Sequence, residues 1–332
     1  KCEKWYTKSK KILYSELNEQ ILSDGAHYEL SIMYHSIILD RLLDCINAIK
    51  NNVIFDTQNE LYIFLMEKAI KMLGWLESII YKDGSIPLLN DTACGVAPSP
   101  IELFQYAKRL ELSWTKIELK DSGYRKFETL QLEILVDIGR IGPDYILGHS
   151  HADTFTYELK INQTSFVVDT GISTYNKNKR RQYERGTSAH NTVSVNSSNS
   201  SQVWGGFRVG KRAKVSVLKD DPQCIIAIHN GFGNIMHKRE FIFNKQAITI
   251  KDDLLGKIKE GCGYIILSPE VKLISIDNAS INTNFASIIF NYSNRIQIEN
   301  CEIAYEYNSL KQTKKICYFF DNHFEYTIIP NL

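Results

Sequence analysis

The chain carries near its centre the stretch Gly148-His149-Ser150-His151-Ala152-Asp153-Thr154-Phe155-Thr156-Tyr157-Glu158-Leu159-Lys160-Ile161. In its second half, apolar and polar residues alternate, and this period of two is typical of a β-strand. Its first half holds two histidines one residue apart. An extended backbone would place His149, His151 and Asp153 on one face. The stretch therefore predicts a strand beside a group of side chains that suit metal binding or proton transfer.

The residues before this stretch, from 1 to about 112, are helical in pattern. In 31–50 and 58–81, apolar side chains recur at helical spacing, which predicts two long helices. Two Asp-Gly turns, Asp24-Gly25 and Asp83-Gly84, lie 59 residues apart, and each follows a helical segment, the first ending in Ile21-Leu22 and the second in Ile79-Ile80. This weak internal repeat favours paired helices stacked in a solenoid or a toroid.

The second part of the chain has the pattern of an all-β domain. A loop over 86–100 and a short helix over 102–110 precede it, and strand patterns begin at about Trp114. We therefore predict an α+β chain of two domains, a helical domain over 1–112 and an antiparallel β-sandwich over 113–332. The predicted strands include Val193/Val195, Val215/Val217, Phe241/Phe243 and the apolar runs 224–228, 247–250 and 286–290.

Two further residues extend the histidine motif into a possible metal site. Asp169 follows His151 by 18 residues, and His190 comes 21 residues later. Asn162-Gln163 predicts a hairpin turn that returns Asp169 toward His151, and a strand over 190–195 beside this hairpin would add His190. Histidine and aspartate suit zinc, which commonly takes three protein ligands and a water. We predict one zinc site, although spacing alone leaves open that these histidines are surface or hydrogen-bonded residues.

Composition excludes several classes of partner. The 332 residues are 44% hydrophobic and 23% charged, as in an ordinary globular protein. A net charge of +1 and a pI near 7.7 give no global field for nucleic acid or a membrane surface. No run approaches the roughly 18 uninterrupted apolar residues that a membrane-spanning helix needs. The seven cysteines are scattered without metal-type spacing, which favours free thiols over a disulfide framework.

Four ordered motifs resemble those of the heparinase II/III-like polysaccharide lyases. The motif in 18–35 contains Asp-Gly-x-x-x-Glu-x-Ser-x-x-Tyr-His, and 149–153 reads His-x-His-Ala-Asp. The other two are Arg185-Gly-Thr-Ser-Ala-His-Asn-Thr-Val193 and Trp204-Gly-Gly-Phe-Arg-Val-Gly210. The resemblance runs through nearly the whole chain. It implies the C-terminal portion of an (α/α) toroid, then an antiparallel β-sandwich, with the active site in the cleft between them.

The resemblance also implies an activity, β-elimination of an anionic, uronate-containing polysaccharide. It assigns Tyr34 as catalytic base or acid and His149 as the catalytic histidine. It assigns His151, Asp169 and His190 to zinc, which leaves His149 free. A positioned tyrosine can remove the C5 proton of a uronate and reprotonate the leaving oxygen, while the metal would fix the His149 segment and add positive field.

Further residues are candidates for substrate contact. Arg181 and Arg185 lie in a basic segment, and guanidinium groups pair well with carboxylate or sulfate. Glu29 and Asn191 are candidates for orienting groups in the site. Members of the resembled family also use an asparagine or histidine to neutralise the uronate carboxylate. We expect that residue to lie before Lys1.

Two other functions stay open at the sequence level. A zinc-dependent hydrolase would act through a metal-bound water, and a non-catalytic remnant of a truncated lyase would bind polysaccharide without turnover. The resemblance favours the periplasm or cell envelope, although the sequence does not exclude the cytoplasm. It does not name the polymer.

Overall fold

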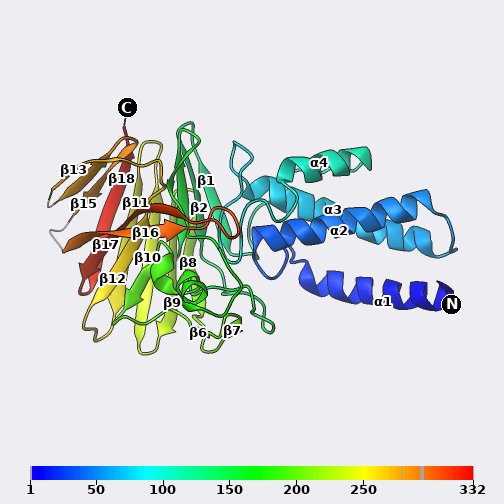
Figure 1. Ribbon diagram of the computed structural model, residues 1–332, viewed down its shortest axis with the longest axis horizontal. Coiled ribbons are helices and arrows are strands. Elements are labelled where there is room, and N and C mark those ends of the chain that lie inside the picture. The colour runs from blue at the N-terminus through cyan, green and yellow to red at the C-terminus, as the bar shows by residue number, and fades with distance from the viewer. Residues whose placement is uncertain (1, 278, 292–294, 332) are drawn as a thin grey trace.

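The computed structural model describes residues 2–277, 279–291 and 295–331, and it separates a helical part from a part built of β-sheets (Figure 1). The long helices extend away from the sheets, and the N-terminus lies at their far end. The helices of this part are α1 (Cys2–Gln20), α2 (Ile32–Asn51), α3 (Gln58–Ile79) and α4 (Pro100–Arg109).

The two long helices expected from the apolar spacing are confirmed as α2 and α3. The N-cap of α2 is Ser31, whose side chain accepts a hydrogen bond from the main-chain N–H of Tyr34. The buried face of α2 packs into the same cluster as α3 and α4. The short helix expected at 102–110 begins at Pro100, after a capping box between Ser99 and Glu102.

Antiparallel ladders join the strands into three larger sheets and a small hairpin. The first sheet has the order β1-β2-β3-β4: β1 (Tyr124–Glu128), β2 (Leu132–Asp137), β3 (Tyr157–Ile161) and β4 (Thr164–Val167). The eight-stranded sheet, in spatial order, contains β13 (Leu273–Ile276), β14 (Ser280–Thr283), β15 (Ala286–Phe290), β18 (His323–Pro330), β11 (Ile248–Leu255), β10 (Ile235–Phe243), β9 (Cys224–Phe232) and β8 (Val215–Asp221). The third contains β16 (Ile296–Ile303), β17 (Lys311–Phe320), β12 (Gly261–Ile266) and β5 (Val193–Val195). The hairpin pairs β6 (Val203–Trp204) with β7 (Arg208–Val209).

One hydrophobic cluster lies among the three larger sheets. Leu159 on β3, Phe241 on β10 and Ile265 on β12 all belong to it, and each is fully buried. The helices bury a second cluster, which also takes in Tyr124 and Leu135 from the first sheet. The α+β class predicted from the sequence is therefore confirmed. The predicted division at 112/113 falls in the segment 111–123, which contains neither helix nor strand.

Strand β3 differs from the simple alternation that its sequence predicts, because all five of its residues are buried. The polar side chains of this strand face the segment that follows α3. Glu158 accepts hydrogen bonds from the Tyr81 hydroxyl and the Leu88 main chain, each at 2.9 Å. Lys160 pairs with Asp83. The outer face of the sheet is thus covered by chain rather than by water.

A buried ion pair ties the eight-stranded sheet to the segments around the histidine motif. Arg239 on β10 and Asp252 on β11 form two hydrogen bonds of 2.7 and 2.9 Å, and both side chains are fully buried. Arg239 also donates to the carbonyls of Phe155 and Asn191, at 2.8 and 2.6 Å. Charge-assisted bonds of this kind hold their partners in a fixed geometry.

The turn at Asp24-Gly25 joins the helical part to the sheet part. The Asp24 carboxylate accepts hydrogen bonds from the main-chain N–H of Lys120 and from both donors of Ser122, at 2.7–3.0 Å. Gly25 has a φ of 87°, and a Cβ at this position would lie 2.3 Å from the carbonyl oxygen of Lys71 in α3. Only glycine allows both the backbone conformation and the close approach.

We expect Gly25→Ala to lower the free energy of unfolding by about 2–4 kcal/mol, because the left-handed conformation and the overlap with α3 both cost energy. Thermal unfolding followed by circular dichroism measures the effect. Gly84→Ala is the matched control, since Gly84 has a φ of 80° and open space around its Cβ position. Equal losses in the two variants would show that contact with α3 is unimportant.

Candidate active site

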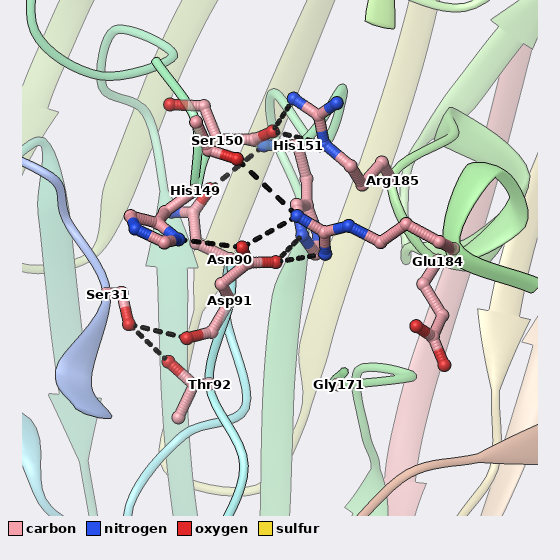
Figure 2. Close-up of polar contacts among 12 residues, drawn as sticks. Ser31, Asn90, Asp91, Thr92, His149, Ser150, His151, Gly171, Glu184 and Arg185 are labelled. Atoms are coloured by element: carbon pink, nitrogen blue, oxygen red, sulfur yellow. Dashed lines mark hydrogen bonds and ion pairs between the residues drawn. The ribbon is translucent and has the colours of Figure 1, made fainter. Parts of the chain in front are cut away.

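The buried carboxylate of Asp91 is the centre of the polar network around the histidine motif (Figure 2). Asp91 lies in the loop between α3 and α4. Its oxygens accept hydrogen bonds from His149 Nδ1 at 2.9 Å and His151 Nε2 at 2.7 Å. Both guanidinium NH groups of Arg181 also donate to it. One carboxylate thus binds both His149 and His151, whereas the extended backbone expected to place Asp153 on the same face is absent, since 148–149 form a turn and 149–156 contain no strand.

This environment shifts the pKa values of the network. Burial by itself raises the pKa of Asp91. The hydrogen bonds from His149, His151 and Arg181 outweigh burial and hold the pKa of the carboxyl well below its usual range. Burial lowers the pKa of His151 to about 4, although Asp91 acts in the opposite direction. Asp91 is thus an anion, and His151 is neutral near pH 7.

Residues beside Asp91 connect it to the helix that carries Tyr34. The Ser31 hydroxyl, at the start of α2, donates to the Asp91 carbonyl at 2.7 Å. Asn90 accepts from the His151 main chain at 3.1 Å and donates to the Leu30 carbonyl at 3.1 Å. The loop over residues 90–92 therefore holds the helical part and the histidine motif in a fixed relation (Figure 2).

The two residues predicted to be catalytic lie against each other. The rings of Tyr34, from α2, and His149, from the sheet part, have centroids 3.9 Å apart with an interplanar angle of 31°. The side chain of His149 is 21% exposed, and Tyr34 is half-buried. Because Nδ1 of His149 is bonded to Asp91, its Nε2 is the nitrogen left for other contacts.

A second tyrosine, which sequence reasoning missed, lies beside this pair. The hydroxyl of Tyr175 shares a hydrogen bond of 3.0 Å with the hydroxyl of Tyr34. Burial and the charges of Asp91 and Glu29 raise the pKa of Tyr34 above its ordinary value, whereas this hydrogen bond and the charge of Arg181 partly offset them. Tyr175 and Arg181 therefore favour the ionised form of Tyr34.

The three predicted metal ligands are fully buried, and His190 lies close to each of the other two. His190 Nδ1 donates to Asp169 Oδ2 at 2.7 Å, and the rings of His151 and His190 have centroids 5.3 Å apart. His151 Nδ1, His190 Nε2 and Asp153 Oδ2 are buried and have no hydrogen-bond partner. Two imidazole nitrogens without partners suit a metal ion. In the described ranges, however, no group of three or more His, Cys, Asp or Glu side chains is arranged to hold one. Zinc stays a prediction.

The two arginines predicted to contact substrate have other partners in the structure. Both are fully buried. Arg181 binds Asp91, and Arg185 donates to the Ser150 carbonyl at 2.8 Å. Arginine side chains usually lie at the surface, which is why a basic segment indicated ligand contact. Their guanidinium groups instead join segments of the protein, and contact with substrate stays a prediction.

The remaining two candidates also lie near the network. Glu29 has its carboxylate 3.9 Å from His27 Nδ1, and burial raises the pKa of Glu29 above its usual value. Asn191 is fully buried, and its amide joins three segments by bonding to Tyr157, Val168 and Ile266 at 2.7–2.9 Å. Asn191 therefore holds the strands beside His190 together, and its predicted contact with substrate stays untested.

Family comparison agrees with this arrangement. A family model described as "Heparinase II/III-like, C-terminal" matches residues 113–322, and one described as "Heparinase II/III N-terminus" matches residues 1–109. The chain belongs to the heparinase II/III-like family. The resemblance seen in the sequence motifs is thus confirmed.

Individual relatives of this heparinase II/III-like chain are distant. A heparin-sulfate lyase of Bacteroides thetaiotaomicron is 23% identical over 298 residues, which are 77% of this chain and 41% of that protein. A heparin-sulfate lyase of Pedobacter heparinus is 21% identical over 291 residues, 78% of this chain and 42% of that protein. The chain therefore spans about two fifths of the length of these curated relatives.

Solved structures show the same fold over almost the whole chain. A heparan sulfate lyase from Pedobacter heparinus has a TM-score of 0.73 at 16% identity, and the match covers 99% of this chain and 56% of that one. A structure titled heparinase III has a TM-score of 0.71 at 20% identity and covers 99% and 57%. At these identities the likeness concerns the fold. In the part of this chain that the structure describes, no helix has the length and apolar character needed to cross a membrane.

We expect Asp91→Ala to destabilise the protein by about 3–5 kcal/mol, because it leaves a buried guanidinium without its anion. Chemical denaturation measures this loss. Asp44→Ala removes a carboxylate that pairs with Arg41 at the surface, and such exposed pairs contribute at most about 1 kcal/mol. If the two variants unfold at the same denaturant concentration, the network at Asp91 does not hold the site together.

Proposed function

We propose that this protein is a polysaccharide lyase that cleaves an anionic, uronate-containing polysaccharide of the heparan sulfate type by β-elimination. The observation that carries the proposal is the contact between Tyr34 and His149, whose rings lie 3.9 Å apart although they come from different parts of the fold. Relatives named heparin-sulfate lyases support it. Because the chain spans about two fifths of those relatives, the activity is proposed for the complete protein.

In the proposed reaction, ionised Tyr34 removes the proton from C5 of the uronate. The electron pair of that C–H bond forms the C4–C5 double bond, and the bond between C4 and the glycosidic oxygen breaks. The leaving oxygen takes a proton, which the Tyr34 hydroxyl can return. The hydrogen bond to Tyr175 and the charge of Arg181 act toward the ionised form of Tyr34, although burial raises its pKa overall.

His149 has a separate role in this scheme. Asp91 fixes the Nδ1 side of the ring, so Nε2 is the nitrogen available to the substrate. It can bind the sugar or serve as the base on the opposite face of the uronate.

We also propose the finer description of the fold. The four helices α1–α4 would be the last part of an (α/α) toroid, and the larger sheets that share one core would form the antiparallel sandwich. The likeness to heparinase III over 99% of this chain supports both assignments.

A zinc ion remains part of the proposal as a support for the site. The proposed ligands are His151, Asp169 and His190; His151 Nδ1 and His190 Nε2 have no hydrogen-bond partner, and Asp169 is bonded to His190 Nδ1. Zinc bound there would fix the segment next to His149 and add positive charge. A zinc-dependent hydrolase is less well supported, because both histidines are fully buried and a metal-bound water beside them would not reach a polymer.

We expect Tyr34→Phe and His149→Ala to lower kcat by at least about 100-fold, since each removes a group that moves a proton. The assay is the ultraviolet absorbance of the unsaturated product, with the complete protein and a panel of uronate polymers that includes heparan sulfate. Tyr106→Phe, on α4, is the control tyrosine and should keep full activity. Absence of unsaturated product from every polymer with the wild type would refute the lyase proposal.

We expect about one zinc per chain in the purified complete protein, measured by atomic emission. His190→Ala should remove it, whereas His323→Ala should not, since His323 lies on β18 in the eight-stranded sheet. A stable wild type that contains no metal would contradict the zinc assignment but would leave the roles of Tyr34 and His149 open to the activity assay.

A further inference from the structure

The hairpin of β6 and β7 presents exposed aromatic and basic side chains beside the candidate active site. Its strands pair Val203 with Val209 and Trp204 with Arg208, so the tip consists of residues 205–207. Both tip glycines have positive φ values, 58° for Gly205 and 80° for Gly206. The tip residue Phe207 is 38% exposed.

Helix α5 (Lys179–Glu184) and its C-cap hold this hairpin by its main chain. Arg181 Nε donates to the Gly206 carbonyl at 2.9 Å, and Gln182 Nε2 donates to the Val203 carbonyl at 2.8 Å. Arg185 donates to the Arg208 carbonyl at 3.3 Å. Because Arg181 also binds Asp91, the hairpin is fixed directly to the network that positions His149.

The ring of Phe207 lies within a line of contacts that ends at Tyr34. Phe207 stacks with Tyr175 at a centroid distance of 5.7 Å and an angle of 21°, and the Tyr175 hydroxyl bonds to that of Tyr34. On another side, a Cβ built at Gly148 would lie 3.7 Å from the Phe207 ring, and Gly148 immediately precedes His149. A partly exposed aromatic ring is thus linked to Tyr34 through Tyr175 and lies against Gly148, the residue before His149.

Two exposed cations lie along the hairpin without a carboxylate partner, and the buried guanidinium of Arg181 lies over the Phe207 ring at 5.3 Å. Lys177 and Arg208 are exposed, and neither forms an ion pair with any residue that the structure describes. Both side chains lie along the tip of the hairpin. Lys177 Cγ is 3.2 Å from a Cβ position built on Gly206, and Arg208 Cδ is 3.9 Å from one built on Gly205. Side chains of this kind are suited to carboxylate or sulfate.

We propose that Phe207 is the sugar-stacking residue next to the bond that is cleaved, with Lys177 and Arg208 binding the acidic groups of that sugar. The inference rests on the proposed function for its choice of ligand. An aromatic face binds the apolar C–H face of a pyranose by dispersion and burial of surface, and the adjacent cations select an anionic sugar over a neutral one.

The test measures binding separately from cleavage. The complete protein carrying Tyr34→Phe is titrated with heparan sulfate by isothermal calorimetry. Phe207→Ala in this background should weaken binding about tenfold, which corresponds to about 1.4 kcal/mol, and Phe207→Trp should retain it. Trp204→Ala is the matched control on the same hairpin. Trp204 is 45% exposed and lies against Gly210, so its loss should leave the affinity unchanged.

The charges are tested in the same way. Lys177→Gln and Arg208→Gln should each weaken binding and reduce its dependence on salt, and dextran, a neutral hexose polymer, should not bind. Thermal unfolding of each variant checks that the hairpin change does not unfold the protein.

The outcomes separate this inference from the lyase proposal. Unchanged affinity in Phe207→Ala, equal losses in Phe207→Ala and Trp204→Ala, or absence of binding to heparan sulfate would each overturn the inference. Binding that depends on Phe207, in a protein whose wild type yields no unsaturated product, would support the inference and refute the lyase proposal.

Discussion

The structure around the candidate site depends on one buried carboxylate, that of Asp91, and on the side chains that donate hydrogen bonds to it. Asp91 receives bonds from two imidazoles and a guanidinium while its carbonyl accepts from Ser31. An isolated buried charge is costly, but each donor here offsets part of that cost. The same bonds hold the rings of Tyr34 and His149 against each other, so the ionic network and the position of the proposed catalytic pair have one cause.

The sequence predicted those elements that leave a regular residue pattern, namely the long helices and the tight turns. Helices α2 and α3 followed from apolar spacing, and the β3–β4 turn at Asn162-Gln163 from turn chemistry, since both residues adopt positive φ values of 49° and 63°. His190 was expected within a strand, whereas the structure has a short 3-10 helix, Thr187–Ala189, before it and β5 begins only at Val193. A helix of only three residues leaves no repeating pattern of apolar side chains, so spacing could not predict it.

Contacts between segments far apart in the chain could not be predicted from the sequence. Asp91 lies 58 residues from His149, in a loop whose composition predicted only a loop. Tyr175 was one of 18 tyrosines, and its place beside Tyr34 depends on a separation of 141 residues. The burial of Arg181 and Arg185 was likewise hidden, because a charged residue is buried only where partners from elsewhere in the chain surround it.

The way in which α5 holds the β6–β7 hairpin makes the position of the hairpin independent of the side chains at its tip. Arg181, Gln182 and Arg185 bind main-chain carbonyls of the hairpin, so the hold does not depend on which side chains the hairpin carries. Side-chain changes at positions 207 and 208 therefore leave intact the main-chain bonds that join the hairpin to the Asp91 network. An engineer could therefore vary positions 207 and 208, the two hairpin residues proposed to contact the sugar, as a compact library for a different polymer.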